Sequence, residues 1–202
     1  MLVRLTMIAS GATLAARKGR FPQDEPLEPQ ALARAGTIGP ELRRADRVLT
    51  SPALGARQTA QALGLEASVE PRLAEQDFGR WAGTGFEEVQ ANDPDGMAAW
   101  LADPDAAPHG GESLADVARR AAALIDGLLA EPGHTIAVTH AGVIRAAIVH
   151  VLGAPLFSIW KIDLEPLSLT DFRSDGRRWV LRASGVDLSS RRDRPGGRGV
   201  RK

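Results

Sequence analysis

The segment Met7–Thr13, with the sequence MIASGAT, guides the interpretation of the whole chain. It closes an apolar stretch that predicts a buried strand over Leu2–Ile8. The strand runs into a turn of small residues, and the turn opens a helix. In α/β proteins, ligands bind beyond the carboxyl ends of such strands. The turn itself offers only the hydroxyl groups of Ser10 and Thr13, so its chemistry must be judged from the rest of the chain.

Strand and helix patterns alternate through the remaining sequence. Apolar and β-branched runs predict further strands at Arg47–Thr50, Ala67–Glu70, Thr135–Thr139, Ser168–Phe172 and Trp179–Arg182. Helical spacing and stop signals predict helices at Ala53–Leu63, from the cap residue Ser113 through Ala130, and at Ala141–Leu152. This alternation favours an α/β fold with a mostly parallel sheet and helices on both faces. We therefore expect a three-layer α/β/α sandwich.

The composition is that of an ordinary globular domain. The chain has 202 residues, of which 44% are apolar and 25% charged, and we expect one domain over residues 1–188. Basic and acidic residues number 25 each, so the net charge does not indicate nucleic-acid binding. No apolar run is long enough to span a membrane. The chain contains no cysteine, which is compatible with a cytoplasmic location.

Two segments depart from the regular pattern. Residues 83–111 form a long insertion that is rich in Asp, Pro and Gly and carries Trp100. Long loops in compact domains are often functional, so we weigh a lid over the strand ends equally with a surface excursion. Residues 189–202 form a basic tail rich in Gly and Arg, which we expect to be disordered.

Two residues stand out as candidates for proton transfer. His140 follows a predicted strand and precedes a helix, a position suited to an anion and to acid–base chemistry. Glu75 lies in the loop after the third predicted strand, where a carboxyl group can donate a proton. Both positions also allow a purely structural role.

Ser10 is a candidate nucleophile in the first turn. A serine needs a base within reach and an oxyanion hole, and no G-x-S-x-G sequence is present. A triad of Ser10, His140 and Glu75 is therefore a minor alternative. His109 and Glu112 belong to a Gly-containing segment, HGGES, whose serine can cap a helix.

Five motifs occur in an order that is typical of one family. They are a strand followed by x-x-G-x-T and Lys18–Phe21 (KGRF), Ser51–Ala60 (SPALGARQTA), Leu73–Gly83 (LAEQDFGRWAG), Gly110–Ser113 (GGES) and Val138–Arg145 (VTHAGVIR). With these motifs the chain resembles the histidine phosphatase superfamily, also called phosphoglycerate mutase-like. The resemblance is greatest to the small bacterial branch that includes α-ribazole phosphatases. It covers about Leu2 to Arg182.

The resemblance implies a phosphate pocket whose main groups differ in this chain. In the family an Arg-His-Gly turn supplies a nucleophilic histidine and an arginine, but here the turn is Ala9-Ser10-Gly11. The second pocket arginine corresponds to Gly55. The proton donor and the second histidine are retained as Glu75 and His140. Fixed cations stabilise a transferring phosphoryl group, so their loss indicates a protein that is not an efficient phosphatase.

Three functions remain open at this stage. The first is a pseudoenzyme that binds a small molecule, for which an anion is one option, or a partner. The second is an enzyme that uses His140 and Glu75 on a substrate without phosphate. The third is a phosphatase with a rebuilt pocket. The residues that we assign to ligand binding are Gly11, Thr13, Arg20, Arg57, His109 and Glu112. We expect no metal or other cofactor, and the fold is compatible with a homodimer.

Overall fold

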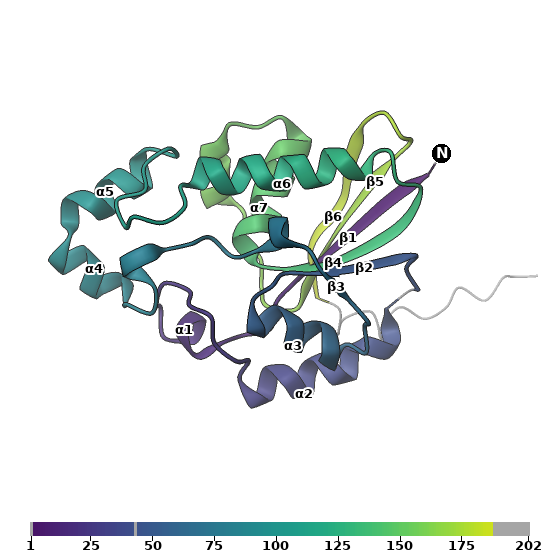
Figure 1. Ribbon diagram of the computed structural model, residues 1–202, viewed down its shortest axis with the longest axis horizontal. Helices are drawn as coiled ribbons and strands as arrows, with labels where there is room; N and C mark the ends of the chain where they lie inside the picture. Colours follow the sequence, from purple (N-terminus) through teal and green to yellow (C-terminus); the bar gives the residue numbers. More distant parts are fainter. Residues whose placement is uncertain (1, 43, 188–202) are drawn as a thin grey trace, which may run out of the picture.

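A six-stranded sheet forms the centre of the molecule (Figure 1). The computed structural model describes residues 2–42 and 44–187, so the predicted basic tail at 189–202 lies outside the described residues. The strand order is β3-β2-β4-β1-β5-β6; β1 to β4 run parallel, and β5 is antiparallel to both β1 and β6. The strands are β1 Val3–Ala9, β2 Arg47–Thr50, β3 Ser68–Val69, β4 Gly133–Thr139, β5 Ser168–Ser174 and β6 Trp179–Asp187.

Helices cover both faces of this sheet, as the sequence predicts. In Figure 1, α6 and α7 lie on one side of the strands, and α2 and α3 lie on the other. The α-helices are α1 Leu14–Arg17, α2 Pro29–Ile38, α3 Leu54–Ala62, α4 Phe86–Asn92, α5 Pro94–Ala102, α6 Leu114–Leu128 and α7 Ala141–Leu152. Short 3-10 helices are η1 Gly39–Glu41, η2 Pro71–Leu73, η3 Gly79–Trp81 and η4 Leu156–Lys161.

The alternation of side chains along β1 divides the core into two layers. Leu5 and Met7 are buried in the cluster that includes the apolar faces of α6 and α7. Ile8 points to the opposite face and is buried with residues of α2 and α3. Successive side chains of a strand point to opposite faces. Val3, Leu5 and Met7 therefore form an apolar row on the side of α6 and α7, while Arg4 and Thr6 on the other side are both bonded to Asp171.

Helix α2 has no counterpart among the sequence predictions. Its buried residues are Ala31, Ala35 and Ile38, which recur at the spacing of one helix face. Two of these three side chains are alanines, so the apolar stripe is faint in the sequence. By contrast, α7 and β2 have the predicted bounds, and β4 begins two residues earlier than predicted, at Gly133.

The predicted insertion at residues 83–111 is partly helical. It contains α4 and α5, which pack on an aromatic cluster that includes Phe21, Phe78 and Trp81. Trp100 of α5 contacts the ring of Trp160, with 5.0 Å between the ring centroids. These contacts give the insertion an apolar core of its own and attach it to η4.

The described part of the chain contains no helix that is both long enough and apolar enough to cross a membrane.

Helix α6 begins with a capping box. Ser113 Oγ accepts a hydrogen bond from the Asp116 backbone N–H at 3.1 Å, and Asp116 Oδ2 accepts one from the Ser113 N–H at 3.1 Å. Two backbone donors that the helix cannot satisfy internally are thereby paired.

We expect Ser113→Ala to lower the free energy of unfolding by about 1 kcal/mol, because the helix loses its cap. Urea unfolding followed by circular dichroism measures this change. Ser68→Ala is the matched control, since Ser68 is exposed on β3 and makes no side-chain hydrogen bond within the described residues. An equal effect of both substitutions would contradict the capping role.

Candidate functional site

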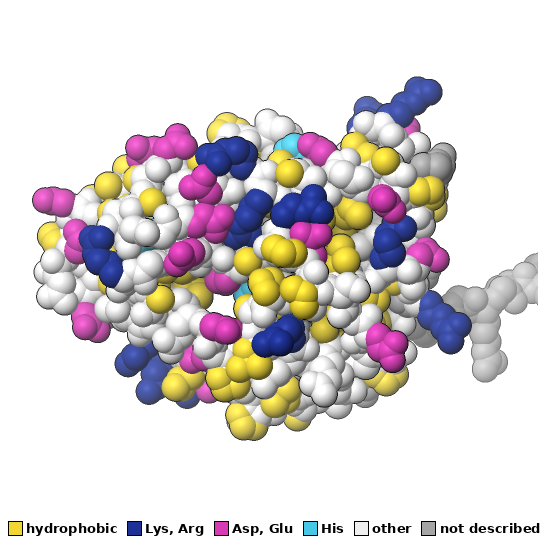
Figure 2. All heavy atoms as spheres, viewed as in Figure 1, with side chains coloured by type: hydrophobic (Ala, Val, Ile, Leu, Met, Phe, Trp, Pro, Cys, Tyr) yellow, Lys and Arg dark blue, Asp and Glu magenta, His cyan; other side chains and the backbone are white. Residues whose placement is uncertain are grey.

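A cavity of about 580 Å³ lies beyond the carboxyl ends of β1, β2 and β4. In Figure 2 the surface is hollowed near the centre of the view, and Asp and Glu side chains lie at the rim. The cavity is lined by Ser10 after β1, by Pro52 and Ala53 after β2, and by His140 after β4. Its volume falls within the range of about 300–1,000 Å³ that is usual for small-molecule sites.

Strand pairing brings these residues together. The Ser10 N–H donates to the Thr139 carbonyl at 2.7 Å, which continues the β1–β4 ladder beyond the strands. The Ser51 N–H donates to the Val138 carbonyl at 2.9 Å on the other side of β4. The three strand ends are therefore held side by side, and the residue after each strand lies at one edge of the sheet.

The Ser10 hydroxyl is bonded to a threonine and makes no hydrogen bond with His140. Ser10 Oγ lies 3.2 Å from Thr59 Oγ1, while Thr59 donates its own proton to the Gly55 carbonyl at 2.8 Å. Thr59 Oγ1 also accepts from the Gly11 N–H at 3.0 Å, so its remaining lone pair can accept the Ser10 proton. Ser10 therefore lacks the neighbouring base that a serine nucleophile needs.

His140 is held through both ring nitrogens. Nδ1 lies 3.2 Å from Glu75 Oε2, and Nε2 lies 2.8 Å from Ser51 Oγ. The Ser51 oxygen accepts from the Ala53 N–H at 3.2 Å, which leaves its proton free to donate to Nε2. When the His140 ring is neutral, its single proton is therefore on Nδ1 and is directed at the Glu75 carboxylate.

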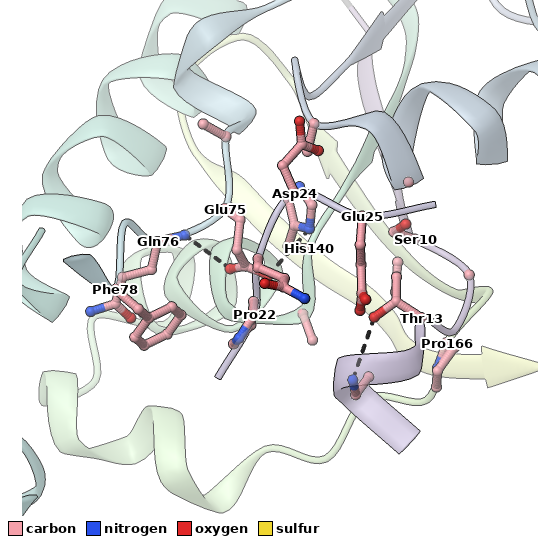
Figure 3. A pocket seen from close by; sticks show the side chains of 18 of the residues that line it. Ser10, Thr13, Pro22, Asp24, Glu25, Glu75, Gln76, Phe78, His140 and Pro166 are labelled. Atoms are coloured by element: carbon pink, nitrogen blue, oxygen red, sulfur yellow. Dashed lines mark hydrogen bonds and ion pairs between the residues drawn. The ribbon is translucent and has the colours of Figure 1, made fainter. Parts of the chain in front are cut away.

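Glu75 is ionised in this arrangement. Burial acts to raise the pKa of Glu75. The positive charge of protonated His140 and the hydrogen bonds from His140 and the Gln76 N–H act in the opposite direction and outweigh burial, so the pKa of Glu75 lies below its ordinary value. Figure 3 shows the Glu75 and His140 side chains next to one another in the pocket. The two residues that the sequence analysis selected for proton transfer are therefore in direct contact.

The remaining ionisable groups of the cavity are acidic. Asp24, Glu25 and Asp77 line it together with Glu75, and none of the described lining residues is a lysine or an arginine. Figure 3 places Asp24 and Glu25 on the segment that crosses the cavity between Ser10 and Glu75. In the described ranges 2–42 and 44–187, no group of three or more metal-ligating side chains could hold a metal ion.

The structure divides the residues that we assigned to ligand binding into two groups. Gly11 and Thr13 line the cavity. Arg20, Arg57, His109 and Glu112 lie outside it, each for a physical reason.

The two arginines point elsewhere. Arg20 donates to the Gly83 carbonyl at 3.2 Å in an exposed position. Arg57 lies two residues after Gly55 on α3, so its side chain points about 200° around the helix axis from the direction of position 55. It lines a smaller pocket of about 200 Å³ with Thr50 and Val69.

His109 and Glu112 have structural partners. The ring of His109 is buried against Trp81, with centroids 5.1 Å apart, and its Nδ1 accepts from the Gly111 N–H at 3.0 Å. Burial lowers the pKa of His109. Glu112 binds Arg120, with 2.6 Å between Oε1 and Nε. No residue of the insertion 83–111 lines the cavity, so Trp100 makes no lid contact there.

Sequence reasoning missed the roles of Ser51, Asp24 and Glu25. Ser51 stood in a quoted motif, and its place at a strand end next to His140 was a usable signal. Asp24 and Glu25 carried no such signal, because their approach to the cavity depends on how the chain between α1 and α2 folds back.

Comparisons with known proteins identify the family. The sequence profile described as histidine phosphatase superfamily (branch 1) matches residues 7–187. The chain belongs to this superfamily. It is 31% identical over 175 residues to the adenosylcobalamin/alpha-ribazole phosphatase of Salmonella typhimurium, covering 81% of this chain and 86% of that protein. The predicted resemblance to the branch that includes α-ribazole phosphatases is thus confirmed.

Further relatives match this chain over different shares of their own length. A bifunctional protein of Mycobacterium tuberculosis is 34% identical over 153 residues, which cover 72% of this chain but only 40% of that protein. The chain thus spans less than half the length of this curated relative. The native structure of mycobacterial glucosyl-3-phosphoglycerate phosphatase matches with a TM-score of 0.80 at 26% identity, covering 92% of this chain and all of the other.

We expect ring ¹⁵N shifts to report the Nδ1–H tautomer for neutral His140, because Glu75 accepts from Nδ1 and Ser51 donates to Nε2. The substitutions Glu75→Gln and Ser51→Ala should each weaken this preference. His150 is an internal control, since its Nε2 lies 2.9 Å from Asp126 Oδ1, which favours the opposite tautomer. An Nε2–H signal from His140 would contradict the arrangement.

Proposed function

We propose that this member of the histidine phosphatase superfamily binds a small molecule in the cavity at the strand ends and does not transfer phosphoryl groups. The observation that carries the proposal is the charge of the cavity. Its described lining contains four carboxyl groups and no lysine or arginine. A phosphoryl dianion needs fixed positive charge in its transition state, and carboxylates would repel it.

The position of the attacking group supports the same proposal. The family resemblance assigns the nucleophilic histidine to position 10, where this chain has a serine. The Ser10 hydroxyl lies against Thr59, which is no base, and the nearest imidazole in the cavity is bonded to Ser51 and Glu75. A hydroxyl group with an ordinary pKa and no base is a poor nucleophile.

The placement of cationic side chains argues against a rebuilt phosphatase pocket. Such a pocket would need Arg20, Arg57, Arg145 or His109 to reach the cavity. Arg20, Arg57 and His109 lie outside the cavity, as described for the candidate site. Arg145 pairs with Asp163 at 3.9 Å. None of the four lines the cavity.

A second candidate function is catalysis on a substrate without phosphate. The 3.2 Å contact between His140 Nδ1 and Glu75 Oε2 favours it, because a carboxylate that orients an imidazole is a common acid–base arrangement. In this candidate, Nε2 would have to leave Ser51 before it could take a proton from substrate. Turnover of such a substrate that is lost in both His140→Ala and Glu75→Gln would favour this second function.

We expect the wild-type chain to hydrolyse p-nitrophenyl phosphate no faster than its His140→Ala variant. The physical reason is that a missing nucleophile and two missing cations cost many tenfold steps, each worth about 1.4 kcal/mol of activation free energy. Steady-state release of p-nitrophenolate measures the rates, and circular dichroism confirms that each variant is folded.

The matched comparison is the triple variant Ala9→Arg/Ser10→His/Gly55→Arg. A β-carbon at position 55 would lie 3.5 Å from Ser10 Oγ and 3.4 Å from the Glu25 carbonyl, so a side chain can leave the helix there without a clash. We expect this variant to hydrolyse the ester at least about tenfold faster than the wild type. Hydrolysis by the wild type that His140→Ala abolishes would overturn the proposed function.

A further inference from the structure

The charges of the cavity point to the class of ligand, on the premise of the proposed function. Three carboxylates line the cavity without an ion-pair partner in the described ranges: Asp24, Glu25 and Asp77. The arginines near them are paired with other acids. Arg17 binds Glu28 at 2.7 Å, and Arg120 binds Glu112.

Each of the three carboxylates accepts a hydrogen bond from a backbone N–H group with one of its oxygens. Asp24 Oδ1 accepts from the Leu54 N–H at 2.7 Å, and Glu25 Oε1 accepts from the Ala15 N–H at 2.6 Å. Asp77 Oδ1 accepts from the Gly79 N–H at 2.8 Å. The second oxygen of each group makes no hydrogen bond within the described residues. These groups are thus fixed in place and retain acceptor capacity toward the cavity.

A metal ion does not fit this arrangement. The described residues contain no group of three or more His, Cys, Asp or Glu side chains that could hold a metal ion. The acids therefore do not converge on one point, and the lining between them includes apolar side chains: Pro22, Phe78, Leu164 and Pro166. A ligand that meets such a surface needs a positive group for the acids and a hydrocarbon part for the apolar wall.

We propose that the cavity binds a small organic cation, a protonated amine with a largely apolar body. The ammonium group, with its three N–H donors, meets the free oxygen of the Glu25 carboxylate, and Asp24 adds negative charge from the same segment. The body of the ligand lies against Phe78 and the prolines. The aromatic face of Phe78 adds a favourable surface for a cation. A charge-assisted hydrogen bond in a partly enclosed site is stronger than one in open solvent.

The test compares ligands that differ only in the polar group. Benzyl, cyclohexylmethyl and n-hexyl skeletons are each supplied as amine, alcohol and phosphate monoester, and dissociation constants are measured by calorimetric titration of the full chain. We expect at least one amine to bind at least about tenfold more tightly than its matched alcohol. We also expect this advantage to shrink as ionic strength rises.

The variant Asp24→Asn/Glu25→Gln removes charge while its amide oxygens can still accept from the Leu54 and Ala15 N–H groups. We expect it to bind the amine at least about tenfold more weakly and the alcohol with unchanged affinity. The matched control is Glu87→Gln/Glu88→Gln, which removes the same charge from two exposed residues of α4 outside the cavity. It should bind the amine as the wild type does.

The outcomes separate this inference from the proposed function. If no amine binds, if an alcohol or phosphate ester binds more tightly than its amine, or if the Asp24/Glu25 variant keeps full amine affinity, the inference is overturned. Those results leave the proposed function in place, provided that the phosphate esters stay intact. Hydrolysis of an ester in a His140-dependent manner would overturn the proposed function instead.

Discussion

The parallel pairing of β1 with β4 is the constraint on which the rest of the site depends. Ala9 is in register with Thr139, and the Ser10 N–H extends the ladder by one more bond to the Thr139 carbonyl. Both strands are buried on two faces, so a shift of register by one residue would turn each apolar side chain to the wrong layer. The residues that follow the two strands are thereby fixed opposite one another.

The helix starts at this edge of the sheet offer N–H groups that are suited to anions, and carboxylates of the chain itself bind them. The backbone N–H groups at the starts of α1 and α3 would otherwise attract a phosphate or similar group. Glu25 bonds to the N–H of Ala15 in α1, and Asp24 bonds to the N–H of Leu54 in α3. The segment between α1 and α2 thus supplies carboxylates of the chain itself to these two N–H groups.

Sequence patterns predicted the parts of the molecule that rest on strong local signals. The apolar runs of β1 and β4 and the long amphipathic α6 are legible because their apolar spacing matches the geometry of the element. Helix α2 was missed because alanines provide much of its buried face, and tertiary packing rather than local hydrophobicity defines it. The insertion was expected to be either a surface excursion or a lid over the strand ends, and its helices were not predicted; burial of Phe21 and Trp81 beneath it stabilises two short helices.

In the candidate site, too, some residues have a clear signal in the sequence, whereas others are placed there only by the tertiary structure. Glu75 and His140 were predicted from motifs next to strands, whose ends converge in any parallel sheet of this order. Arg57 was assigned because it is near position 55 in sequence, and His109 and Glu112 because they belong to the HGGES segment. Neither argument determines the direction of a side chain. Asp24 and Glu25 reach the cavity through the path of an irregular segment, and no periodicity encodes such a path.

The positions of the tryptophans determine what intrinsic fluorescence can report. The indoles of Trp81 and Trp160 both lie against Trp100, with centroids 6.2 Å and 5.0 Å away, so these three fluorophores exchange excitation energy. Trp179 lies apart on β6 and donates to the Ile125 carbonyl at 3.1 Å. None of the four lines the cavity. Emission therefore reports the contact between the insertion and η4, together with the far edge of the sheet. It senses an occupant of the cavity indirectly, through lining residues such as Phe78, whose ring centroid lies 6.2 Å from that of Trp100.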